Sequence, residues 1–80
     1  MNIYLTRHAQ EQMQEQEDDV TEEQIKAVLD NHHSIHHGSQ PSTIRYLGSI
    51  GARELNVVAE RPGIAREPVK IVTVYWEDEE

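Results

Sequence analysis

The 80-residue sequence predicts a single α+β domain in which two N-terminal helices pack on an antiparallel sheet of three or four strands. Three observations support this fold class. Helical periodicity is confined to about the first 31 residues, segments with strand-like alternation follow it, and no repeat or linker interrupts the chain. We therefore expect one domain over residues 1–76, followed by an acidic tail, EDEE, over residues 77–80.

The first helix is expected to begin after Thr6, whose hydroxyl can cap it, and to run to about Glu17. Leu5, Ala9 and Met13 recur at four-residue spacing and form a narrow apolar stripe. The acidic residues that follow interrupt this helix, because adjacent carboxylates are unfavourable near a helix C-terminus.

The second helix is expected to start at Thr21 and to end near Asn31. The sequence TEEQ at its start is typical of a capping box, in which the Thr21 hydroxyl accepts a backbone amide proton while the Gln24 side chain reaches back. The apolar residues of this helix predict one buried face, made of Ile25, Val28 and Leu29.

The rest of the chain alternates as strands do, with a turn between Gly48 and Gly51. The predicted strands are Ser34–His37, Thr43–Gly48, Arg53–Glu60 and Val69–Trp76. In the strand Arg53–Glu60, alternation places the apolar Leu55, Val57 and Ala59 on one face. The polar Glu54, Asn56 and Glu60 then lie on the other, solvent-exposed face. In the last, alternation places Val69, Ile71, Thr73 and Tyr75 together. Both of its faces are mostly apolar, which predicts an interior position in the sheet.

The composition excludes several classes of protein. Cysteine is absent, so the chain has no disulfide framework, thiolate metal site or cysteine nucleophile. The sequence shows no apolar run of membrane-spanning length, and its start, MNIYLTRHAQ, lacks a signal-peptide core and a lipidation motif. A cytoplasmic protein with no membrane partner is the expectation.

The net charge of −8 is unevenly placed along the chain. Residues 1–31 carry eight acidic and two basic side chains, residues 32–76 carry three acidic and five basic ones, and residues 77–80 are all acidic. The overall charge argues against tight nonspecific binding of nucleic acid. The mildly basic sheet segment nevertheless leaves room for a local anion site.

A few side chains are candidates for chemistry. His8, in the first turn of the first helix, could act as acid or base, although surface histidines are commoner at such a position. Arg45 and Arg53 could grip a phosphate with their planar guanidinium groups, or pair with nearby carboxylates. Tyr75 could stack on a base or donate a proton.

His32, His33, His36 and His37 form the densest group of titratable side chains. Their spacing would allow pairs to share a metal ion, but the sequence has no HExxH motif and no carboxylate motif beside them. A solvated junction between helix and strand is the simpler interpretation. We therefore predict neither a metal site nor a cofactor.

Four segments carry a family resemblance: YLTRHAQEQM at 4–13, the second helix at 21–29, RELNVV at 53–58 and KIVTVY at 70–75. In their order and spacing they resemble the family called domain of unknown function 4258. Its members open with a Leu-Thr-x-His-Ala-x-x-Arg-Met pattern and close with a Val-Thr-Val-Tyr strand. That family looks like a branch of the RelE-like toxin nucleases, within the barnase, EndoU and colicin assemblage.

The resemblance implies a RelE-like fold and metal-independent RNA cleavage by a toxin of a bacterial toxin–antitoxin pair. His8 then matches the histidine of the pattern and would serve as acid or base. Arg53, with Arg45, would hold the scissile phosphate, Tyr75 would stack or donate a proton, and Thr73 would bind substrate beside it. The implied partners are an RNA substrate and an antitoxin protein.

Two features of the sequence favour a different function on the same fold. Gln12 stands where the family pattern has an arginine, and the charge of −8 repels RNA at long range. The alternative is a non-enzymatic interaction module with a decayed site, in which the acidic helices or an exposed sheet edge bind a partner protein or a second copy of the chain. A histidine-cluster metal binder ranks last.

Overall fold

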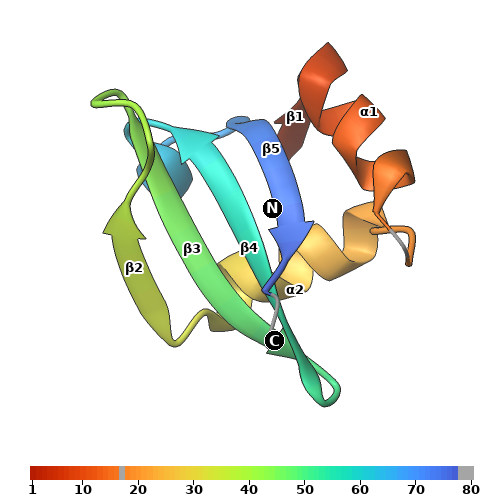
Figure 1. The fold of residues 1–80 in the computed structure, drawn as a ribbon. Helices are drawn as coiled ribbons and strands as arrows, with labels where there is room; N and C mark the ends of the chain where they lie inside the picture. The colour runs from red at the N-terminus through yellow and green to blue at the C-terminus, as the bar shows by residue number, and fades with distance from the viewer. Residues whose placement is uncertain (17, 78–80) are drawn as a thin grey trace.

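The computed structural model describes residues 1–16 and 18–77, which form two helices and a five-stranded sheet (Figure 1). The strand order across the sheet is β1-β5-β4-β3-β2. β1 runs parallel to β5, and the other neighbours are antiparallel. The elements are β1 (Ile3–Leu5), α1 (Arg7–Glu15), α2 (Glu22–Asn31), β2 (Ser34–His37), β3 (Thr43–Ile50), β4 (Arg53–Glu60), a 3-10 turn (Gly63–Ala65) and β5 (Val69–Trp76). The α+β class and the two N-terminal helices are confirmed.

The two helices leave one face of the sheet uncovered. Figure 1 looks onto this face: α2 lies behind the sheet, and α1 lies beside β5 at the end where β1 is placed. The hydrophobic core fills the space between the helices and the hidden face. Its fully buried members include Ala9, Ile25, Val28, Leu29, Leu55, Val57, Ala59, Val69, Ile71 and Val74. The uncovered side is called the open face below.

Both predicted helix starts are confirmed. The Thr6 hydroxyl accepts a hydrogen bond from the backbone amide of Ala9 at 3.1 Å. The Thr21 hydroxyl accepts from the amide of Gln24 at 3.1 Å, and the Gln24 side chain accepts from the amide of Thr21 at 3.0 Å. These caps satisfy amides that the first helical turn leaves without a partner. The predicted end of the first helix, near Glu17, lies outside the described residues.

The predicted count of three or four antiparallel strands is wrong, because Ile3–Leu5 forms a fifth strand, β1. Leu5, expected on the apolar stripe of the first helix, belongs to this strand instead. β1 pairs with Val69–Ile71, so its partner lies 65 residues or more further along the chain. A three-residue segment of this kind has no local signal, since only its distant partner makes it a strand.

The interior position predicted for β5 is confirmed, but β1 covers only its first part. Beyond that point, the side-chain amide of Gln16 takes the place of a neighbouring strand. It donates to the carbonyl of Val74 and accepts from the amide of Trp76, each at 3.4 Å. The end of α1 thus satisfies backbone groups that an exposed sheet edge would leave open.

β3 continues two residues beyond the predicted end at Gly48, and Gly51 then makes the turn with φ +63°. Gly48 is buried beneath α2: a Cβ atom there would lie 3.1 Å from Cγ1 and 3.3 Å from Cα of Val28. This glycine therefore allows the close approach of a helix rather than a turn.

A bulge in β5 changes which of its side chains share a face. Val58 pairs with Thr73 while the next residue, Ala59, pairs with Ile71, so Val72 is the extra residue. The predicted grouping of Thr73 and Tyr75 with Val69 and Ile71 is therefore wrong. Val74 joins the core, and Thr73 and Tyr75 turn to the open face, because an extra residue reverses the alternation beyond it.

Candidate functional site

The open face carries the polar side chains that the sheet register brings together. Arg45 on β3 pairs with Val58 on β4, and Val58 pairs with Thr73 on β5. One row further along, Asn56 on β4 pairs with Tyr75 on β5. Side chains of directly paired residues point to the same face, so these three strands present one surface.

A pocket of about 470 Å³ lies on this surface. The loop after β2 borders it on one side, and the end of β5 borders it on the other. It is called the open-face pocket below, and its polar lining residues are His37, Ser39, Arg45, Thr73, Tyr75 and Glu77. The open-face pocket therefore gathers an arginine, a histidine, a carboxylate and three hydroxyls.

Asn56 positions two charged side chains at this pocket through hydrogen bonds. The wet position predicted for it is wrong, since its side chain is fully buried, with 0% exposed. Its Oδ1 accepts a hydrogen bond from the Arg45 guanidinium, and its Nδ2 donates to Glu77 Oε1 at 2.7 Å. Because both polar atoms of this buried amide have hydrogen-bond partners, its burial leaves no polar group unpaired.

One buried amide thus orients a cation and an anion at the same pocket. Arg45 is half-buried, whereas Glu77 is exposed. Within residues 1–16 and 18–77, Arg45 forms no ion pair. Its guanidinium has five donors, of which Asn56 occupies one nitrogen, so the remaining donors are available to an anionic ligand.

Three of the five predicted site residues line the open-face pocket: Arg45, Thr73 and Tyr75. His8 lies elsewhere, exposed in the first turn of α1, and does not line it. A catalytic role for His8 stays a prediction.

Arg53 lies at the start of β4, on the face that the helices cover. Alternation places its side chain with Leu55, away from the open face. Its guanidinium pairs with the Asp18 carboxylate and lies over the Trp76 ring, 4.3 Å from the centroid. The structure therefore does not bring Arg53 together with Tyr75, and its observed contacts are with Asp18 and Trp76.

Asn56, Glu77 and His37 escaped the sequence-based selection. Asn56 lies within LNVV, the most apolar part of β4. A single amide in such an apolar stretch is the sequence signal that could have indicated a buried, hydrogen-bonded side chain. The sequence places Glu77 in the acidic tail, whereas in the structure it follows β5 directly. His37 belongs to the histidine cluster that we interpret from the sequence as a solvated junction between helix and strand. Its Nδ1 contacts Arg61 Nη2 at 3.3 Å.

Three of the four histidines of residues 32–37 contact different partners. His32 meets the ring of Tyr46 edge-on, with centroids 5.0 Å apart, and His33 lies 3.5 Å from the Glu54 carboxylate. Within the part of the chain that the structure describes, no three metal-ligating side chains come together.

Comparison with known proteins matches the chain to a family model. The family model described as Domain of unknown function (DUF4258) matches residues 5–76, which is nearly the whole chain. No curated protein and no solved structure matches the chain. Within the described residues, no helix is long and apolar enough to cross a membrane. On the extent of this match, the chain belongs to the family Domain of unknown function (DUF4258).

Proposed function

We propose that the open-face pocket binds RNA and cleaves it without a metal ion, as a RelE-like toxin of a toxin–antitoxin pair would. One observation carries this proposal: the buried Asn56 amide holds Arg45 and Glu77 at a single pocket that Tyr75 also lines. In cleavage of a phosphodiester, a cation can stabilise the charge on the phosphate, a carboxylate can act as base and a phenol can act as acid.

In the proposed reaction the 2′-oxygen of one nucleotide attacks the adjacent phosphorus, and the bond from phosphorus to the 5′-oxygen breaks. Glu77 accepts the proton of the 2′-hydroxyl, and the Tyr75 hydroxyl gives its proton to the departing 5′-oxygen. The products are a 2′,3′-cyclic phosphate and a 5′-hydroxyl end. Water then returns the proton from Glu77 to Tyr75.

Arg45 supplies the electrostatic part of the proposed catalysis. Negative charge grows on the phosphate oxygens as the 2′-oxygen adds, and a fixed guanidinium stabilises this charge more than that of the ground state. Asn56 holds the guanidinium before substrate binds, so little reorganisation is required. The hydroxyl of the half-buried Thr73 lies in the same row as Arg45 and can donate to a phosphate oxygen.

The test is incubation of purified protein with a synthetic single-stranded RNA, followed by separation of the products and identification of their ends. We expect 2′,3′-cyclic phosphate ends, and we expect Glu77→Gln and Tyr75→Phe to lower the cleavage rate at least tenfold, since acid–base groups contribute about 10²–10⁴. Glu23→Gln, on the exposed first turn of α2, is the matched control and should cleave at the wild-type rate. Intact RNA after incubation with the wild-type protein would contradict the proposal.

The non-enzymatic alternative has one structural observation in its favour. β2 lies at the edge of the sheet, and Ile35 on this strand is 57% exposed. An edge strand with an exposed apolar side chain can pair with a strand of another chain. Intact RNA, together with a dimer in sedimentation that Ile35→Lys converts to monomer, would favour this alternative.

A further inference from the structure

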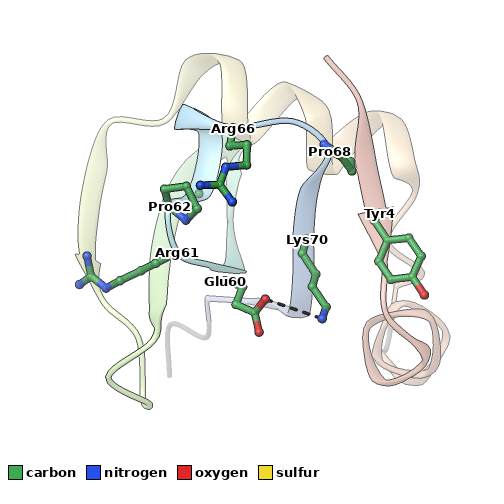
Figure 2. A pocket seen from close by; sticks show the side chains of 8 residues that line it. Tyr4, Glu60, Arg61, Pro62, Arg66, Pro68 and Lys70 are labelled. Carbon is green, nitrogen blue, oxygen red and sulfur yellow. Dashed lines mark ion pairs between the residues drawn. The ribbon is translucent and has the colours of Figure 1, made fainter.

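A second pocket, of about 420 Å³, lies on the open face at the start of β5. Its charged lining residues are three cations and one carboxylate: Arg61, Arg66, Lys70 and Glu60. Tyr4 of β1 also lines it. This pocket, called the cationic pocket below, is drawn in Figure 2.

Arg66 and Lys70 both contribute positive charge to this pocket. Figure 2 shows Lys70 extending toward Glu60, while Arg61 points away toward the edge of the sheet. Lys70 Nζ lies 3.7 Å from Glu60 Oε1. Arg66 is exposed and forms no ion pair with any residue that the structure describes. After Lys70 and Glu60 offset each other, the cationic pocket keeps an excess of positive charge in a chain whose net charge is −8.

The cationic pocket continues the open-face pocket along β4. Val58 lines the open-face pocket and Glu60 lines the cationic pocket, two residues further along the same strand. Positions two apart in a strand share a face and are separated by about 6.6 Å. Arg61 joins the two pockets, because it lines the cationic pocket while its Nη2 contacts His37, which lines the other.

An aromatic ring stands beside the positive charge. Tyr4 is 56% exposed and pairs with Lys70 across β1 and β5, so both side chains lie on the open face. Proteins bind single-stranded nucleic acid by this combination of a cationic track for the backbone and aromatic rings on which bases stack. A base-paired duplex offers no free base to such a ring.

We propose that the cationic pocket binds a backbone phosphate of single-stranded RNA, one or two nucleotides from the phosphate at Arg45, with a base stacked on Tyr4. This inference rests on the proposed function and names its substrate as single-stranded RNA held at two places. Arg66 and Lys70 grip the flanking phosphate, and Glu60 is released from Lys70 as the phosphate binds.

The test separates binding from cleavage. The probe is a fluorescent RNA about eight nucleotides long in which every 2′-hydroxyl is methylated, so that 2′-oxygen attack cannot occur. Its binding is followed by fluorescence anisotropy between about 50 and 200 mM salt. We expect Arg66→Gln and Lys70→Gln each to lower the slope of log affinity against log salt by about 0.7, which is about a threefold change over this range. Tyr4→Leu should weaken binding at every salt concentration without changing the slope.

Matched controls remove the same charges elsewhere. Lys26→Gln breaks a comparable pair, since Lys26 Nζ lies 3.8 Å from Glu22 on α2. Arg7→Gln removes an arginine whose side chain is 93% exposed on α1. Both should bind the probe as the wild type does, because neither residue lines either pocket.

Each outcome decides a different question. Equal binding by Arg66→Gln, Lys70→Gln and the controls overturns the inference, even if the wild type cleaves RNA. Binding that depends on Arg66 and Lys70 supports it, and the proposed cleavage still fails if unmodified RNA stays intact. Tighter binding to a duplex than to the single strand overturns the inference in favour of a ligand recognised by its shape. Displacement of the probe by polyglutamate at equal charge concentration overturns it in favour of an acidic polypeptide ligand.

Discussion

The guanidinium of Arg53 lies over the indole ring of Trp76, with its Cζ atom 4.3 Å from the ring centroid. The same guanidinium pairs with the carboxylate of Asp18, and the Trp76 indole nitrogen donates to the backbone carbonyl of Asp18 at 2.8 Å. These three residues join the start of β4, the end of β5 and the segment before α2. Arg53 therefore has a structural task on the covered side of the sheet.

We expect Arg53→Gln to lower the free energy of unfolding by about 1 kcal/mol, since exposed cation–π contacts and exposed ion pairs each contribute up to about that amount. Urea denaturation measures this change, with Arg7→Gln as the control on an exposed helix. The rate of RNA cleavage should not change. Wild-type stability combined with lost cleavage would return Arg53 to the catalytic role that the family resemblance implies.

Asn56→Asp should both destabilise the chain and lower cleavage. The substitution keeps the shape but replaces the Nδ2 donor, which bonds Glu77, with a carboxylate oxygen that repels it. Leaving a buried hydrogen bond unmade costs about 1–3 kcal/mol. Thermal unfolding measures the loss, and Gln40→Glu, the same amide-to-carboxylate change on an exposed residue before β3, is the comparison. If the two variants unfold at the same temperature, Asn56 does not support the open-face pocket.

Gln16→Ala should expose the backbone of β5 to exchange with solvent. The amide of Trp76 loses its acceptor and the carbonyl of Val74 loses its donor. Hydrogen exchange of the Trp76 amide, followed by NMR, should become faster in this variant. Gln14→Ala, an exposed change on the same helix, should leave that rate unchanged. Equal rates in both variants would show that α1 does not protect this edge.

Gly48→Ala should destabilise the packing of α2 on β3. The new Cβ atom would lie 3.1 Å from Cγ1 and 3.3 Å from Cα of Val28, so α2 must move away from β3. Overpacking of this kind costs about 1–3 kcal/mol. Urea denaturation checks the value against Ser49→Ala, a neighbouring change on an exposed side chain. An unchanged midpoint would mean that the helix is free to shift.

Local signals in the sequence were sufficient for the helices and for most strands. Thr6 and Thr21 cap their helices through residues only three positions away, so a short segment contains all the information. The alternation of Leu55, Val57 and Ala59 likewise reports a buried face without reference to any other strand. β1 has no such signal, because Ile3–Leu5 becomes a strand only by pairing with Val69–Ile71 of β5.

The candidate site depended on pairings that the sequence does not contain. Arg45, Thr73 and Tyr75 meet because of the register of three strands and an extra residue in β5. Strict alternation would have sent Thr73 and Tyr75 into the core. The burial of Asn56 follows from neighbours on β3 and at the end of β5, so its polar character alone predicted a wet position. A local pattern cannot anticipate a bulge.

The pairing of β1 with β5 also sets the order in which the fold can form during synthesis. Hydrogen bonds from Thr6 to the backbone of Ile71 span 65 residues, and the amide of Val69 bonds the carbonyl of Asn2. A nascent chain that ends before β5 leaves the first strand without a partner and the open face without Thr73, Tyr75 and Glu77. Contacts of such long sequence separation slow folding. On the ribosome, both proposed pockets therefore stay incomplete until residues 69–77 have emerged.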